Sequence, residues 1–308
     1  MGTGERKERG RPFFLVSVLF IIASVVLVAA PRGVRIVDDF SVYEYQPEQY
    51  TSITNEVVAT SAVIYDIDAN RILAGKNPMT PTSIASITKL TAALIAVRKI
   101  NDFDTTTVTE EDLSVLQITP IKPGDRWRTL DLIRYALMTS SNGGISAVAR
   151  TVEEKVGTPL VDLMNTFARE HGLVQTHFVN VTGLDAHGTL AGSESSARDL
   201  AAIASILIRN EPELANATAR SERLFYTLDG REYRAENTNE LLGNLPHPVL
   251  LSKTGFTNIA GGTLLMVLEI QGRRIAFVVL NSTKEERFID MQTLFQLYRS
   301  MLLSPSVR

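Results

Sequence analysis

The segment PTSIASITKLTAALIAV, residues 81–97, begins with polar residues and continues as an apolar pattern of helical period. Its leucines and final valine recur at i, i+4 and i+7, which predicts that one face of a helix packs in the core. Ser86 and Lys89 lie three residues apart near the start, so a helix places both side chains on one face. Two interpretations fit this pair. Either the serine caps the helix while the lysine extends to the surface, or a neutral lysine takes the proton of the serine.

The composition of the 308-residue chain is that of a globular protein with a substantial core, since 44% of its residues are hydrophobic and 21% charged. A net charge of −3 gives no electrostatic reason to expect a nucleic-acid partner. The absence of cysteine excludes disulfides, iron–sulfur clusters and thiolate zinc sites. The four histidines are scattered without metal-binding spacing, so we expect neither a metal nor another cofactor.

The N-terminal residues have the pattern of an export signal or a membrane anchor. Residues 1–12 are predominantly basic, and residues 13–30, FFLVSVLFIIASVVLVAA, carry no charge. As a helix this run covers about 27 Å, close to the hydrocarbon thickness of a membrane. Small residues at 28–30 suit signal peptidase, but Pro31 follows them, and the run exceeds the roughly 7–15 residues of a signal peptide core. We therefore predict a retained single-pass anchor in the cell membrane, with everything after it extracytoplasmic.

The remainder of the chain is predicted to hold a linker and one domain. Residues 31–54 show neither a helical nor a strand period and are expected to form a juxtamembrane linker. Residues 55–305 are expected to form an α+β catalytic domain, in which N-terminal and C-terminal strands pair in an antiparallel sheet around a helical subdomain. Strands are predicted within 55–77 and 251–281, a hairpin turn at Asp229-Gly230, short strands and turns at 105–129, and helices at 86–100, 130–138, 143–155, 158–170, 196–209 and 284–303.

Two further motifs follow the first helix. TSSNGG, residues 139–144, contains Ser140 and Asn142 two positions apart, and LLSKTGFT, residues 250–257, contains Lys-Thr-Gly on a predicted strand. Chance alone would give a Ser-x-x-Lys about 0.5 times in this chain, but a Lys-Thr-Gly only on the order of 0.04 times. The three motifs occur in order on a helix start, a loop and a strand. This combination is the signature of penicillin-binding proteins and serine β-lactamases.

With these motifs the chain resembles the D-alanyl-D-alanine carboxypeptidases of the low-molecular-weight penicillin-binding type, serine peptidase family S11. The resemblance covers residues ~55–303 and includes AVIYDIDANRILAGKNPMTPTSIASITKLTAAL, GLDAHGTLAGSESSARDLA and NTNELL. It implies a β-lactamase/transpeptidase-like fold. In two places the chain departs from the family pattern, since Gly143-Gly144 stand where Asp-Ala is usual, and Leu251-Ser252 where a glycine usually precedes Lys-Thr-Gly.

The residue types in the three motifs suit an acyl-enzyme mechanism. A serine hydroxyl is a poor nucleophile until a neighbouring base removes its proton. Lys89 can serve as that base if its pKa falls, and both burial and a second cation, Lys253, would lower it. Lys253 and Thr254 suit a terminal carboxylate through charge and a hydroxyl hydrogen bond. Gly255 allows a substrate backbone to lie close to the strand.

The resemblance completes the predicted site. It implies that Ser140 relays the proton to the leaving amine and that Asn142 holds the substrate amide and Lys89. The backbone N–H groups of Ser86 and Phe256 would form the oxyanion hole. The implied reaction removes the terminal D-alanine from peptidoglycan stem pentapeptides through an acyl-enzyme on Ser86, with β-lactams as covalent inhibitors.

Three alternative functions use the same fold or the same groups. A peptidoglycan DD-endopeptidase would use the same groups and stays open. A class A β-lactamase needs a deacylating glutamate, and EPELANA, residues 211–217, resembles the loop that carries it. However, Glu211 lies about 70 residues after Ser140, roughly twice the separation in that family, so we expect this stretch to continue a helix. A catalytically inactive wall-binding protein is disfavoured because every candidate catalytic side chain is present.

Overall fold

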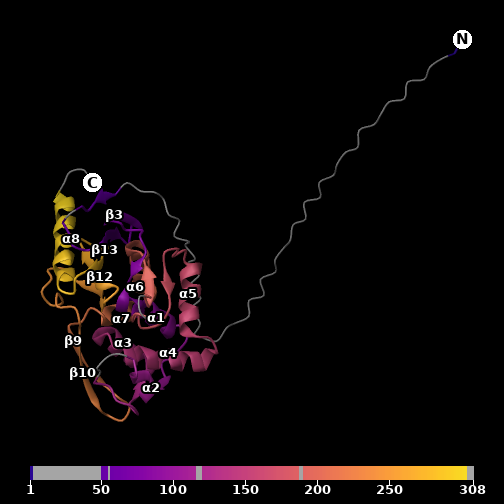
Figure 1. The fold of residues 1–308 in the computed structure, drawn as a ribbon, viewed down its shortest axis with the longest axis vertical. Helices are drawn as coiled ribbons and strands as arrows, with labels where there is room; N and C mark the ends of the chain where they lie inside the picture. Colours follow the sequence, from indigo (N-terminus) through magenta and orange to yellow (C-terminus); the bar gives the residue numbers. More distant parts are fainter. Residues whose placement is uncertain (3–49, 55, 116–119, 187–189, 304–308) are drawn as a thin grey trace. The chain divides into compact units, whose positions relative to one another are not determined.

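The fold was analysed in a computed structural model, which describes residues 1–2, 50–54, 56–115, 120–186 and 190–303 (Figure 1). The chain divides into two units, Met1–Phe40 and Ser41–Arg308, and the architecture below is that of the second. The predicted membrane anchor at 13–30 lies outside the described residues, as do residues 3–12 of the basic segment. Within the described ranges, no helix is long and apolar enough to cross a membrane.

A six-stranded sheet joins the two ends of the domain, in the strand order β1-β3-β2-β13-β12-β11. The N-terminal β2 pairs antiparallel with the C-terminal β13, so that Val63 lies opposite Val278. This confirms the prediction that N-terminal and C-terminal strands share one sheet. The strands are β1 Thr51–Ser52, β2 Ser61–Asp66, β3 Arg71–Lys76, β11 Val249–Thr257, β12 Gly261–Ile270 and β13 Arg273–Ser282.

The first strand corrects two predictions. β1 runs parallel to β3, so the sheet is mixed and not wholly antiparallel. It also falls within residues 31–54, the predicted linker, and the following Ile53 is buried and donates its N–H to the carbonyl of Gly75 at 2.9 Å. The folded domain therefore begins before residue 55. A two-residue strand is too short to show an alternating pattern in the sequence.

Helices cover both faces of the sheet (Figure 1). Side chains along β2 alternate between two cores, because successive residues of a strand point to opposite faces. Val63 and Tyr65 join the core beneath α1, Thr88–Val97, and α6, Ala197–Asn210, whereas Ile64 joins the core beneath α8, Glu286–Leu303. On the α8 side the ring of Phe277 meets that of Phe295 edge to face, with centroids 4.7 Å apart. Two buried faces explain why the central strands read as almost continuous hydrophobic runs.

The helical half lies between the N-terminal and C-terminal strands and follows the predicted helices closely. Its principal helices are α1 Thr88–Val97, α3 Thr129–Thr139, α4 Asn142–Val156, α5 Leu160–Glu170 and α6 Ala197–Asn210, and α8 Glu286–Leu303 ends the described domain. Ser196 caps α6, because its side-chain hydroxyl accepts the N–H of Asp199. The predicted hairpin is also present, as β9 Glu222–Tyr226 and β10 Glu232–Glu236 around a turn in which Gly230 has a φ of 79°.

Two short helices differ from the prediction. α2, Glu110–Leu113, forms between β5 Thr105–Thr107 and β6 Arg126–Arg128, in a segment expected to hold only strands and turns. A capping box between Thr109 and Asp112 stabilises it. α7, Pro212–Ala217, starts a new helix, because the backbone at Glu211 leaves the helical region before Pro212. EPELANA therefore does not continue α6. Proline is favoured at the first position of a helix, because the N–H that it lacks would have no partner within the helix there.

Candidate active site

Ser86 lies at the turn between β4, Thr82–Ser83, and α1. It belongs to a single 3₁₀ turn, η1, Ala85–Ile87, and neither η1 nor α1 has a side-chain cap. The interpretation of Ser86 as a helix cap is therefore wrong. Ala85 adopts a left-handed backbone conformation with φ 47°, which is strained for a residue other than glycine. This sharp turn fixes the direction in which the Ser86 hydroxyl points.

Lys89 is fully buried and directly contacts Ser86. Its Nζ lies 2.7 Å from Ser86 Oγ and 2.7 Å from the backbone oxygen of Thr182. An amine in this position does not extend to the surface. Burial lowers the pKa of Lys89 well below its usual value, and the charge of Lys253 lowers it further. Both causes match the sequence expectation, and they favour the neutral amine that a proton acceptor must be.

Lys253 connects the Lys-Thr-Gly motif to the Ser-x-Asn motif. Its Nζ donates to Ser140 Oγ at 2.9 Å and to the carbonyl oxygen of Thr254 at 2.8 Å. Ser140 ends α3 with a left-handed φ of 58°, which turns the chain sharply. The side chain of Lys253 is buried, and burial followed by the charge of Arg287 lowers its pKa to about 7. Lys89–Ser86 and Lys253–Ser140 are thus two hydrogen-bonded pairs, and the charge of Lys253 acts on Lys89.

The strand β11 passes close to the Ser86 turn, and Gly255 is the point of closest approach. A methyl group at position 255 would lie 2.9 Å from the backbone nitrogen of Ser86 and 2.5 Å from Thr263 Oγ1. Glycine is therefore required for this packing. Thr254 is buried beside it, whereas the next residue, Phe256, is 45% exposed. β11 is also the last strand of the sheet, with β12 as its only neighbour among the described strands.

Asn142 begins α4 and is buried, two residues after Ser140. The helix start is packed tightly beneath α2, since a methyl group at Gly143 would lie 2.5 Å from Leu113 Cδ2 and 3.1 Å from the backbone oxygen of Asp112. This close approach explains one departure from the family pattern. A larger residue at position 143 would require the Leu113 side chain to move.

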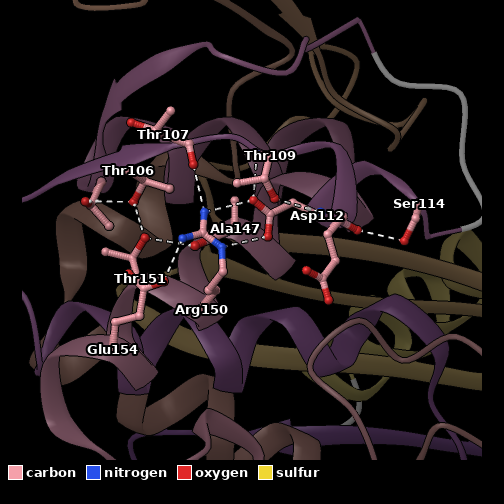
Figure 2. Close-up of polar contacts among 11 residues, drawn as sticks. Thr106, Thr107, Thr109, Asp112, Ser114, Ala147, Arg150, Thr151 and Glu154 are labelled. Carbon is pink, nitrogen blue, oxygen red and sulfur yellow. Dashed lines mark hydrogen bonds and ion pairs between the residues drawn. The ribbon is translucent and has the colours of Figure 1, made fainter.

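An ion-pair network holds α2 and α4 together further along (Figure 2). Arg150 of α4 donates to both carboxylate oxygens of Asp112, at 3.2 and 2.9 Å, and to the carbonyl oxygen of Thr107 at 2.7 Å. It also bonds Glu154 at 2.9 Å. Hydrogen bonding to Asp112 is the largest of the effects that raise the pKa of Arg150 above its usual value. This network braces the helix that carries Asn142.

All eight predicted site residues lie in the three segments that the structure brings together, but sequence reasoning missed three neighbours. The Thr182 carbonyl accepts from Lys89, the Thr238 hydroxyl contacts Thr254, and the Arg287 guanidinium donates to the Gly255 carbonyl at 2.8 Å. A backbone carbonyl leaves no signature in residue type. Arg287 had no motif to mark it. Across the described residues, no cluster of histidines and carboxylates has the arrangement of a metal site.

Comparison with known proteins relates this geometry to one family. The family model for D-alanyl-D-alanine carboxypeptidase, peptidase S11, matches residues 47–284. A D-alanyl-D-alanine endopeptidase from Pseudomonas aeruginosa is 29% identical over 245 residues, which cover 77% of this chain and 75% of that protein. D-alanyl-D-alanine carboxypeptidase DacB2 from Mycobacterium tuberculosis is 28% identical over 230 residues, covering 74% of this chain and 76% of that protein.

Solved structures agree with the sequence relatives. Penicillin-binding protein D2 from Listeria monocytogenes, in its ampicillin-bound form, superimposes with a TM-score of 0.66 and 27% sequence identity. The match covers 82% of this chain and 99% of that one. The fold is therefore the α+β fold of penicillin-binding proteins, as the sequence predicted.

Proposed function

Since the chain belongs to the D-alanyl-D-alanine carboxypeptidase family and is a serine hydrolase, we propose that Ser86 is its nucleophile. We further propose that its substrate is a peptidoglycan stem pentapeptide. The reaction removes the terminal D-alanine. One observation carries the proposal. The buried amine of Lys89 lies 2.7 Å from Ser86 Oγ, within the same Ser-x-x-Lys motif. A hydroxyl in contact with a neutral amine is an activated nucleophile.

Acylation begins when Ser86 Oγ attacks the carbonyl carbon of the scissile amide and Lys89 Nζ takes the hydroxyl proton. The negative charge that develops on the carbonyl oxygen is stabilised by two backbone N–H groups, those of Ser86 and Phe256. Gly255 packs against the Ser86 nitrogen, which supports the placement of both donors around one point. Loss of one such donor typically lowers the rate by ~10²–10³.

The leaving D-alanine needs a proton on its amine nitrogen. The Ser140 hydroxyl gives its proton to this nitrogen. Lys89, now protonated, gives a proton to Ser140 Oγ in turn. The 2.9 Å contact between Lys253 Nζ and Ser140 Oγ supports this role, because it orients the hydroxyl. Asn142 holds the substrate amide during the transfer. Water then attacks the acyl carbon, Lys89 accepts a proton from the water, and Ser86 Oγ leaves with a proton restored.

The free carboxylate of the terminal D-alanine is the group that distinguishes this substrate. Lys253 offers a charge for it and Thr254 a hydroxyl, both on the strand beside Ser86. A bound carboxylate favours the protonated form of Lys253, whose pKa is otherwise lowered to about 7. Because β11 has a free edge among the described strands, an extended peptide can lie along it as an added strand.

A DD-endopeptidase remains the second candidate, because the Pseudomonas aeruginosa relative carries that name. The two activities differ in whether a free carboxylate sits next to the scissile amide. We expect a pentapeptide amidated at its C-terminus to react at least ~30-fold more slowly than the free acid, since a shielded charge-assisted pair contributes ~2–5 kcal/mol. Equal rates on the two peptides would favour the endopeptidase.

Covalent labelling tests the nucleophile. A fluorescent penicillin should acylate Ser86 of the full-length chain, and its carboxylate should lie by Lys253 and Thr254. Peptide mapping should find the label on Ser86, and Ser86→Ala should abolish labelling while Ser83→Ala, three residues earlier, retains it. Label on any other residue, or none, would contradict the assignment. Rapid release of the penicilloyl group would indicate a β-lactamase, with Glu211 the first residue to substitute.

We further propose that residues 13–30 anchor the chain in the cell membrane, with residues 1–12 inside and the catalytic domain outside. The uncharged eighteen-residue run and its basic flank support this arrangement. The full-length chain should stay with the membranes in an alkaline carbonate wash, whereas a chain beginning at residue 31 should be released. Release of both would show that the segment does not anchor the protein.

A further inference from the structure

One side chain organises the turn that contacts Lys89. Asn180 lies just after β7, His177–Phe178, and its Oδ1 accepts three hydrogen bonds: from the Thr182 N–H at 3.1 Å, the Thr182 hydroxyl at 2.9 Å and the Gly183 N–H at 2.7 Å. Its Nδ2 donates to the Leu184 carbonyl at 2.9 Å. A single amide thus fixes the backbone over five residues.

The Asn180 hydrogen bonds orient the backbone carbonyl of Thr182 toward Lys89. The Thr182 oxygen, held between two residues bonded to Asn180, accepts from Lys89 Nζ at 2.7 Å. A neutral amine has two N–H bonds and one lone pair. With one N–H directed to Thr182, rotation about the Cε–Nζ bond is restrained, and the lone pair can be presented to the Ser86 hydroxyl 2.7 Å away.

The turn that carries Thr182 is closely packed against its neighbours. A methyl group at Gly183 would lie 1.9 Å from the Ala85 backbone oxygen, so the turn sits directly against η1. A methyl group at Gly192, in front of β8, Ser193–Ser195, would lie 2.7 Å from Asn180 Nδ2. Asp185 ties the same turn to the end of β11, by accepting from the Thr257 hydroxyl at 2.7 Å.

We propose that Asn180 is a positioning residue for the proton acceptor: its side chain holds the Thr182 carbonyl against Lys89 Nζ and so directs the amine at Ser86. This inference rests on the proposed function of Lys89. The charged group that acts on that amine is Lys253 of β11, whose charge lowers the pKa of Lys89. Asp185 lies on the same turn as Thr182, and its carboxylate accepts from the Thr257 hydroxyl and the Ile259 N–H.

The test compares the pH dependence of penicillin acylation in the full-length chain and in two variants. Asn180→Asp keeps the three accepting contacts, loses the donation to Leu184 and adds a negative charge two residues from Thr182. That charge favours protonated Lys89, so the acid limb of the rate profile should move to higher pH by about 0.5–1 unit. Asn180→Ala should lower the plateau rate about tenfold or more, because small misplacement of a reacting group is costly.

Asn165→Ala is the matched control. Asn165 also exchanges two hydrogen bonds with backbone, those to the Phe178 carbonyl at 2.8 Å and from the Phe178 N–H at 2.9 Å, but it does not contact the turn that carries Thr182. It should lower the melting temperature and leave the acid limb and the plateau within twofold of the wild type. A similar shift in this control would assign the effect to general loosening and overturn the proposal.

Folded Asn180 variants with the wild-type plateau and acid limb would also overturn it. Should Asn180→Asp fail to fold, Thr182→Val decides, because it removes only the hydroxyl that bridges Asn180 and the Leu184 N–H. An unchanged plateau there would refute the proposal, and a fall of about threefold or more would support it. Failure of the proposed function is recognised separately, since the wild-type chain would then show no label on Ser86 at all.

Discussion

Lys89 and Arg150 are two basic side chains of the same helical half, and their surroundings are opposite. Arg150 meets Asp112, Glu154 and a backbone carbonyl, and its pKa is raised (Figure 2). Lys89 meets a hydroxyl, a backbone carbonyl and the charge of Lys253, and its pKa is lowered. The salt bridges found among the described residues include neither Lys89 nor Lys253. One cation is paired and holds two helices, whereas the other is kept from pairing and can lose its proton.

This difference has a cost in stability that depends on pH. Lys253 has a pKa of about 7 in the folded chain against 10.5 for an ordinary lysine. Between these values the unfolded chain binds more protons, so this group makes the fold less stable as the pH falls from 10.5 to 7. Below about pH 7 both states are protonated and the full penalty is present. Lys89, with its lowered pKa, acts in the same direction. A site that retains two such groups is arranged for chemistry at the expense of stability.

The largest expected effect comes from making Lys89 a permanent cation. Lys89→Arg keeps the charge but cannot deprotonate, so the rate of Ser86 acylation should fall by ~10²–10⁴, nearly as far as in Lys89→Ala. Arg150→Lys is the control, and its folded fraction should acylate within about threefold of the wild type. An arginine variant that kept more than about a tenth of the rate would show that Lys89 is not the proton acceptor.

Breaking the paired cation should affect folding instead. Arg150→Met leaves the buried Asp112 carboxylate without its guanidinium partner, which should lower the free energy of unfolding by about 1–3 kcal/mol. Urea titration at neutral pH measures this. Glu154→Gln removes only the exposed partner and should change stability by less than about 0.5 kcal/mol. If Arg150→Met kept its stability but lost acylation, the network would belong to the site and the contrast with Lys89 would fail.

The smallest effect concerns the alkaline limb of the acylation profile. Protonated Lys253 holds the β-lactam carboxylate, so the rate should fall as the pH rises through about 7, the pKa of that lysine. Arg287→Gln removes the nearby charge that lowers this pKa and should move the limb to higher pH. Arg287→Lys retains the charge and should leave the limb in place. If the alkaline limb moved equally in both variants, the cause would be the lost hydrogen bond to the Gly255 carbonyl and not the lost charge.

The sequence allowed the parts of the site that depend on residue type to be predicted. Ser86 and Lys89 could be placed together because helical spacing puts positions i and i+3 on one face, whereas Lys253 was placed beside them by the resemblance of the three motifs to a known family. The Thr182 carbonyl could not be predicted, because any residue provides one. The left-handed turn at Ala85 could not either, since alanine seldom adopts it.

The same reasoning accounts for the errors in the fold. α2 and β1 contain four and two residues, which is too short for a periodic pattern to appear. The parallel pairing of β1 with β3 depends on a tertiary contact that local sequence does not encode. The break at Pro212 was available from the sequence, because proline favours the first turn of a helix and disfavours its interior.

The account depends on the lowered pKa of Lys89, which should favour the neutral amine, and the titration of this lysine can be observed directly. Lysines of the full-length chain can be labelled with ¹³C at Cε, and the Lys89 signal assigned by its absence in Lys89→Arg. We predict that this signal titrates well below pH 10.5, and that it moves back toward that value in Lys253→Met, which removes the neighbouring charge. A Lys89 signal that titrates with those of the surface lysines would contradict the account.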